Sequence, residues 1–377
     1  MSAERRTEPG ERPRLYFLDN LRAFVIVMVV VLHASITYMA FGPEWWYVVD
    51  PDQSLTFTAL VLLVDVPNMP ALFFVAGFFA LPSLERRGFQ GFVREKSVRL
   101  AIPWLFAVVF LAPLATYMIY VSRDIPIGYL EFWTRDFWGP LYQQSVYWFL
   151  GVLFVLFLLL AGLHEPHKRP AGIEHPAERP RTRFFVAFVT LTALGSMLVA
   201  PRYSIDDWQP VWILLVVQPA RIALYVAFFA LGVHAERRGW FRADGYRPEP
   251  GPWGIACLVA GLAYLVLRLA VPPETEAGRI AGAMLFSPFC LTAVMYGLAV
   301  FQRHVAGTGR AWRTLADNSF GIYYVHPLIL YPLAFVLVGV SIPALGKAIV
   351  LVAVTLLASL AVSSLVLRRV PGLRRVF

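Results

Sequence analysis

The chain has 377 residues, of which 58% are hydrophobic and only 15% are charged, and its formal net charge is +9. A soluble domain usually contains about 25% charged residues and lacks long apolar runs. Such runs recur here from one end of the sequence to the other, with the basic residues between them. This pattern excludes an ordinary soluble protein, and it points to membrane orientation rather than to nucleic-acid binding.

The apolar runs predict an all-α polytopic membrane protein with about ten transmembrane helices, because each run is long enough to cross a hydrocarbon core about 30 Å thick. They are too uniformly apolar for barrel strands, which alternate polar and apolar residues. The expected spans are residues 20–40, 55–81, 100–121, 146–163, 184–200, 211–235, 253–271, 280–301, 318–340 and 347–367.

Basic residues concentrate in the two terminal segments and in every second loop, and the loops between carry few. By the positive-inside rule, both termini are expected in the cytoplasm. The predicted organisation is a cytoplasmic tail at 1–19, a transmembrane domain at 20–367 and a basic cytoplasmic tail at 368–377. No removable signal peptide is expected, because the first residues are charged and the first apolar run is too long.

The first span, LDNLRAFVIVMVVVLH, carries Arg22 and His33 on one face. Their separation corresponds to about 20° past three full helical turns and to about 16 Å of rise. A charge at membrane depth is costly, so each residue is a functional candidate. The pair suits a long ligand with an anionic end at Arg22 and a reactive end at His33. Alternatively, Arg22 snorkels to the interface beside Asp19, and His33 is a hydrogen-bonded structural residue.

The second span places Asp65 near mid-membrane, shortly before Pro67 and Pro70. A carboxylate beside His33 would fix its tautomer and stabilise its protonated form, so a pair between Asp65 and His33 is expected. The alternative is that Asp65 bonds a neighbouring helix or caps a helix break at Pro67.

The ninth span carries Ser319, Tyr323 and His326 along one helical face, where they either line a substrate site or form a structural network. Arg221 could serve a cavity or bind a carboxylate elsewhere. Arg268, close to the outer end of its span, is expected to snorkel. No metal site is predicted, because His164, His167 and His175, which share one loop, do not have metal-ligand spacing.

Five segments occur in order along the chain: LDNLRAFVIVMVVVLH with Leu18, Asp19, Arg22 and His33; ALFFVAGFF at 71–79; REKSVRLAIPW with Arg94, Lys96 and Arg99; YWFLGVLFVLFL at 147–158; and SFGIYYVHPLIL with Ser319, Phe320, Tyr323 and His326. Together they resemble the integral-membrane acyltransferase-3 family. In that family the first span has Leu-Asp and then Arg, ten residues and His. The third segment resembles the family's cytoplasmic basic stretch. In the second segment, a serine of the family is replaced here by Ala76.

The sequence looks most like the glucan biosynthesis protein C (glucan succinyltransferase) subgroup, and this resemblance implies a reaction. Family members move an acyl group, usually acetyl or succinyl, from cytoplasmic acyl-CoA to a carbohydrate across the membrane. It implies an acyl-CoA-dependent O-acyltransferase in the bacterial cytoplasmic (inner) membrane. The co-substrate is acyl-CoA, no cofactor is expected to be permanently bound, and the acceptor is a periplasmic glucan or a surface polysaccharide.

The resemblance implies that Arg22 and His33 are needed for activity, and we expect the following roles. His33 is expected to act as general base or as acyl-carrying nucleophile, Arg22 to bind CoA phosphate or polarise the thioester, and Asp65 to orient His33. The candidate substrate-binding residues are Asp19, Arg94, Lys96, Arg99, Arg221, Ser319, Tyr323 and His326.

Two alternatives stay open. Plain positive-inside anchoring explains the basic loop equally well. The intramembrane charges also suit a transporter or flippase for a lipid-linked sugar or an anionic solute. The sequence decides neither the acyl group nor the acceptor sugar nor the oligomeric state.

Overall fold

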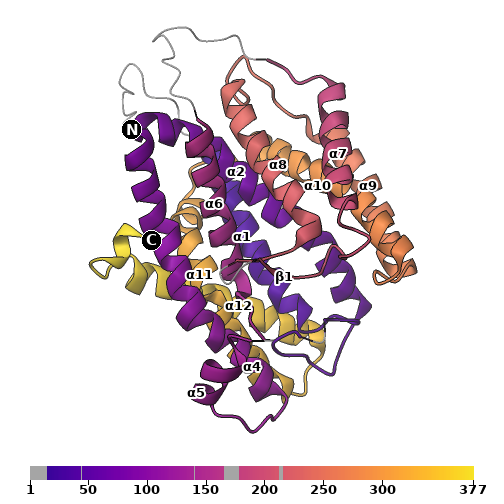
Figure 1. Cartoon of the computed structure of the whole chain (residues 1–377), viewed down its shortest axis with the longest axis vertical. Helices are drawn as coiled ribbons and strands as arrows, with labels where there is room; N and C mark the ends of the chain where they lie inside the picture. Colours follow the sequence, from indigo (N-terminus) through magenta and orange to yellow (C-terminus); the bar gives the residue numbers. More distant parts are fainter. Residues whose placement is uncertain (1–14, 44, 140, 165–177, 212–214) are drawn as a thin grey trace.

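The computed structural model of the chain describes residues 15–43, 45–139, 141–164, 178–211 and 215–377. Most of this part is helical, and Figure 1 shows the helices packed alongside one another. Most of the predicted N-terminal tail lies outside the described residues. The helices are α1 (Tyr16–Ile36), α2 (Leu55–Lys96), α3 (Ile102–Phe106), α4 (Ala112–Ser122), α5 (Tyr129–Glu131), α6 (Trp148–Leu163), α7 (Thr182–Met197), α8 (Pro219–Arg237), α9 (Pro250–Ala270), α10 (Glu276–His304), α11 (Arg310–Val338) and α12 (Ala344–Val362).

Within the described residues, 7 helical segments are long and apolar enough to cross a membrane. This agrees with an all-α polytopic membrane protein, whereas the count of about ten spans and the cytoplasmic termini remain predictions. The segments are Tyr16–Ile36, Leu55–Ser122, Ser145–Leu163, Pro250–Ala270, Glu276–His304, Arg310–Val338 and Ala344–Leu367.

The second and third predicted spans belong to one helical run, Leu55–Ser122. At 1.5 Å per residue, such a run would be about 100 Å long if straight, far more than one membrane crossing. The run leaves helical geometry at Gly88, with φ 69° and ψ 171°, a conformation that favours glycine. Within α2 the dihedral angles at Pro67 and Pro70 stay helical, so the expected helix break falls at Gly88 instead.

The sixth predicted span, 211–235, starts as a β-hairpin rather than a helix. Strands β1 (Gln209–Val211) and β2 (Leu215–Val217) pair antiparallel, with Gln209 opposite Val217. Helix α8 follows at Pro219, a residue suited to a first helical turn. Short apolar runs do not distinguish a strand from a helix, so these two strands were predicted as part of a helical span. Figure 1 shows β1 near the middle of the view.

Helices α2 and α8 are held close together by two glycines. A Cβ atom at Gly77 would lie 2.0 Å from the carbonyl oxygen of Phe229, and one at Gly232 would lie 2.1 Å from that of Phe74. Small residues at such a crossing let two backbones approach closely within a membrane. The close crossing fixes the register of α2 against α8, and with it the positions of their buried polar side chains.

Helix α9 lies at the edge of the bundle in Figure 1, and its apolar window is only 11% buried. One face of α9 therefore exposes a row of aliphatic side chains, namely Ile255, Leu258, Val259, Leu262, Val266 and Leu269. A continuous aliphatic face on a fully hydrogen-bonded helix is suited to lipid rather than to water.

Candidate active site

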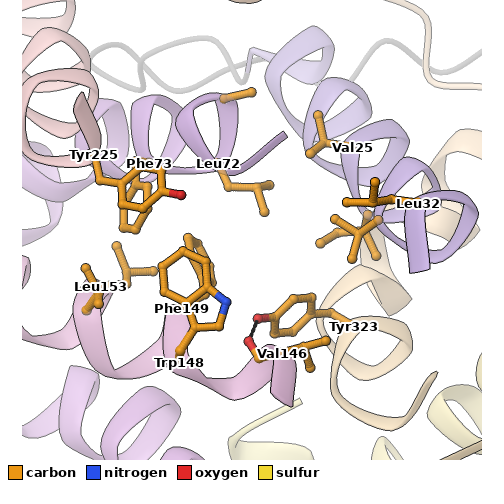
Figure 2. Packing of buried hydrophobic residues seen from close by; sticks show 14 of the residues in the cluster. Val25, Leu32, Leu72, Phe73, Val146, Trp148, Phe149, Leu153, Tyr225 and Tyr323 are labelled. Atoms are coloured by element: carbon orange, nitrogen blue, oxygen red, sulfur yellow. Dashed lines mark hydrogen bonds between the residues drawn. The ribbon is translucent and has the colours of Figure 1, made fainter. Parts of the chain in front are cut away.

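Two cavities have Tyr323 on α11 as a common lining residue. The first, of about 680 Å³, is walled by many aromatic rings and is called the aromatic cavity here. The second, of about 480 Å³, is lined by Arg22, Lys96, Arg99 and Arg368 and is called the basic cavity. Among the described lining residues, Tyr323 is the one that both share. Its hydroxyl donates to the carbonyl oxygen of Val146, and Figure 2 shows it facing the cluster around Phe149 and Trp148.

His33 on α1 and His326 on α11 form a pair at the aromatic cavity. The Nδ1 atom of His33 lies 3.0 Å from the Nε2 atom of His326, and the rings stack at 5.3 Å with an interplanar angle of 13°. His326 is fully buried, and His33 lines the cavity. His33 also stacks against Trp46, with ring centres 5.8 Å apart.

The backbone fixes which nitrogen of each histidine carries a proton. The Nδ1 atom of His326 lies 2.8 Å from the carbonyl oxygen of Tyr323, which can only accept a hydrogen bond. His326 therefore donates from Nδ1, so in its neutral form its Nε2 accepts from the Nδ1–H group of His33. The remaining lone pair of neutral His33 is then on Nε2, which leaves that atom as a proton acceptor.

Arg22 lies in the basic cavity, together with Lys96, Arg99 and Ser319 from the predicted set. Its guanidinium is 3.4 Å from Asp19 and donates to the carbonyl oxygen of Ala316. Arg22 and His33 thus line two different cavities, which have Tyr323 as a common lining residue. Arg94 is exposed and lines neither cavity.

The expected pair between Asp65 and His33 is wrong. Asp65 instead accepts a hydrogen bond from Arg221 at 2.6 Å, while His33 pairs with His326. The reason is tertiary: the glycine-mediated crossing of α2 and α8 brings Arg221 to Asp65. Arg221 is 4% exposed in its side chain, and its Nε and Nη2 atoms donate to the carbonyl oxygen of Ile205 and to Asp206.

Arg268 was expected to snorkel, but it is also held by this network. It donates to Asp206 at 2.6 Å and to the hydroxyl of Tyr264 at 2.9 Å. Partial burial raises the pKa of the Asp206 carboxyl, but the guanidinium groups of Arg268 and Arg221 outweigh that effect. The pKa of Asp206 therefore lies below its ordinary value. In this network the charges of Asp65 and Asp206 balance those of Arg221 and Arg268. Both aspartates also line the aromatic cavity.

Several site residues were missed from the sequence. The aromatic cavity draws on loops as well as helices, and its rings include Trp46, Tyr47, Trp148, Trp208, Tyr225 and Tyr331. Arg368, assigned to the C-terminal tail, lines the basic cavity. Within the described residues, no group of three or more His, Cys, Asp or Glu side chains is arranged to hold a metal ion.

Residues 15–368 match the family described as an acyltransferase domain, the acyltransferase-3 family. The chain belongs to this family. Membership assigns a membrane acyltransferase, and it disfavours the transporter or flippase that the intramembrane charges also allowed.

Relatives named Glucans biosynthesis protein C are similar to this acyltransferase. The chain is 25% identical over 279 residues to the Salmonella gallinarum protein and 26% identical over 277 residues to that of Salmonella paratyphi B, covering 67% of this chain and 66% of each relative. It is 27% identical over 154 residues to the Escherichia coli O6:K15:H31 protein, covering 39% of this chain and 38% of the relative. The chain thus spans just under two thirds of the Salmonella relatives. No solved structure matches the chain at a significant level.

Proposed function

We propose that this protein transfers an acyl group from acyl-CoA, bound in the basic cavity, to a hydroxyl group of a carbohydrate bound in the aromatic cavity. The hydrogen-bonded pair of His33 and His326 carries the proposal, because it leaves an unprotonated Nε2 at a cavity wall. The protein is proposed to reside in the bacterial cytoplasmic membrane with acyl-CoA arriving from the cytoplasm.

In the proposed reaction, His33 Nε2 takes the proton of the sugar hydroxyl as the oxygen attacks the thioester carbonyl carbon. A carbon–oxygen bond forms, the carbon–sulfur bond breaks, and CoA leaves as a thiolate. The proton on His33 then passes to that thiolate, which restores the neutral pair. His326 accepts a hydrogen bond from His33 throughout and stabilises its imidazolium form.

The basic cavity suits the donor. CoA is a long polyanion, and Arg22, Lys96, Arg99 and Arg368 gather at one cavity. Arginine forks match phosphate geometry. Because Arg22 is about 16 Å along α1 from His33, it is placed to bind a phosphate while the thioester reaches the histidine pair. Of the two roles expected for Arg22, phosphate binding therefore fits better than polarising the thioester.

The aromatic cavity suits a sugar. Flat apolar ring faces such as those of Trp46 and Trp148 can stack on the C–H face of a pyranose, while side-chain amides such as those of Gln143 and Gln209 offer hydrogen bonds to hydroxyl groups. The names of the relatives point to a glucan, so the acceptor we propose is a periplasmic glucan or a related surface polysaccharide.

Replacement of His33 by Ala tests the proposal. We expect acyl transfer to a carbohydrate acceptor, followed with radiolabelled acyl-CoA and purified protein, to fall by at least about 100-fold. His304→Ala, at the exposed end of α10, is the matched control and should keep wild-type activity. A His33→Ala protein that inserts normally and still acylates at the wild-type rate would refute the proposal.

A further inference from the structure

The chain is packed firmly against α11 up to Leu367 and loosely beyond it. The hydroxyl of Ser363, a fully buried residue, donates to the side-chain oxygen of Asn318 at 2.8 Å, and Leu367 is buried as well. Residues 368–375, in contrast, are all exposed. Figure 1 shows this segment, in yellow, at the edge of the helical bundle. A segment with few buried contacts opens at a lower cost in free energy than the core from which it extends.

The loose segment returns to the bundle at an aromatic contact. Its backbone turns at Gly372, where φ is 98° and ψ is −56°, a conformation that favours glycine. Phe377 then stacks on Phe320 with ring centres 5.0 Å apart and an interplanar angle of 24°, and it meets Tyr324 edge-on at 5.1 Å. The hydroxyl of Tyr324 donates to the carbonyl oxygen of Pro103 at 2.8 Å. The platform on which the segment docks is therefore fixed by its own contacts.

The docked segment is part of the wall of the basic cavity. Arg368, Val376 and Phe377 line this cavity, and so does Phe320, on which Phe377 stacks. When Phe377 leaves Phe320, the side chains of Val376 and Phe377 move away from the cavity. Undocking the segment therefore removes one wall and widens the way into the cavity.

The segment also carries a cation to the cavity. Arg368 lies 3.9 Å from Asp317, and the two side chains, which both line the cavity, are 39% and 52% exposed. So long and exposed an ion pair contributes little to stability, because water screens both charges. A phosphate group is a stronger partner for a guanidinium, since it accepts two parallel hydrogen bonds. A bound anion can thus take Arg368 from Asp317 and favour the docked position of the segment.

We infer that residues 368–377 form a lid over the basic cavity, docked by Phe377 on Phe320, and that the acyl donor enters and CoA leaves when this lid lifts. The inference rests on the proposed function, which places acyl-CoA in the basic cavity. A lid differs from an ordinary ligand contact in its kinetics. Loss of a contact raises the dissociation rate constant alone, whereas loss of a lid raises the association and dissociation rate constants together.

Binding of CoA to the purified full-length protein in nanodiscs, followed by surface plasmon resonance, tests the inference. We expect Phe377→Ala to raise both rate constants at least about threefold, because the lid no longer docks. Phe377→Tyr keeps the stacked ring and should retain wild-type rates. The matched control is Phe89→Ala, which removes an exposed ring that lines neither cavity. A rise in the dissociation rate constant alone, or no change in either constant, overturns the inference.

A reversible crosslink applies the opposite perturbation. Phe320→Cys and Phe377→Cys are introduced together with Cys257→Ala and Cys290→Ala, so that the native thiols do not react, and a short bifunctional thiosulfonate joins the new pair. Compared with the same variant before crosslinking, we expect CoA exchange and acyl transfer to fall at least about tenfold and to return on reduction.

The outcomes separate the inference from the proposed function. Unchanged CoA exchange after complete crosslinking overturns the lid and leaves the proposed function standing. A wild-type protein that neither binds CoA nor consumes an acyl-CoA thioester overturns the proposed function and the lid with it.

Discussion

His33 and His326 come from helices far apart in the sequence, yet the Nδ1 atom of one lies 3.0 Å from the Nε2 atom of the other. The carbonyl oxygen of Tyr323 fixes the direction of this hydrogen bond, because it accepts from the opposite side of the His326 ring. The pair thus orients the imidazole at the cavity wall in the way that a carboxylate orients a histidine in a catalytic triad.

His326 is accordingly predicted to be a positioning residue. We expect His326→Ala to lower kcat about 10- to 100-fold with little change in KM for the acyl donor, because the Nδ1–H group of His33 loses its acceptor. His326→Gln, whose side-chain oxygen can accept that hydrogen bond, should recover part of the rate. The measurement is steady-state kinetics on protein with verified insertion. Equal losses in both variants would argue for a packing role instead.

Asp65 is predicted to act on stability rather than on the histidine pair. Asp65→Asn weakens the bond to Arg221 but leaves the contact between His33 and His326 in place. We expect a loss of about 1–3 kcal/mol in the free energy of unfolding, seen as a lower thermal midpoint in detergent. The pH profile of acyl transfer should keep its shape. A shifted profile with unchanged stability would restore a direct role beside His33.

The lowered pKa of Asp206 predicts that the folded protein loses stability in acid. Its pKa is lowered in the folded protein, so the carboxylate stabilises the fold above its unfolded pKa of about 3.9. That contribution is lost as the pH falls below about 3.9 and through the folded pKa. We expect the thermal midpoint of the wild type to drop over this range, and that of Asp206→Asn to start lower and to drop less. Parallel curves for the two proteins would contradict the prediction.

A further buried ion pair links the loop between α1 and α2 to α12. Lys347 donates to Asp50 at 2.8 Å, and their side chains are 4% and 0% exposed. Lys347→Met leaves the carboxylate buried without its cation, so we expect a loss of about 3–5 kcal/mol in the free energy of unfolding.

The double variant Lys347→Met with Asp50→Asn removes both charges and should recover much of that stability, which unfolding in denaturant can measure. A double variant less stable than either single variant would show that the pair contributes net stability.

The sequence predicted the all-helical membrane class, the family and most of the helix positions. The membrane class could be predicted because the hydrophobicity of a long window depends only on its composition. The family motif of the first span could be found because Arg22 and His33 lie in one short segment. Helical spacing predicted that Ser319, Tyr323 and His326 share one face of a helix. In the structure, Ser319 and Tyr323 line the basic cavity, and His326 pairs with His33. These features follow from the period of one helix and need no knowledge of its neighbours.

Pairing between helices was decided only by the tertiary structure. Asp65 and Arg221, Arg268 and Asp206, and His33 and His326 are each separated by many residues, and no sequence period relates them. Their partners depend on how closely α2 approaches α8, where Gly77 and Gly232 remove the side chains that would keep the backbones apart. In a membrane, every intramembrane charge needs a partner, but helix packing selects which one it meets.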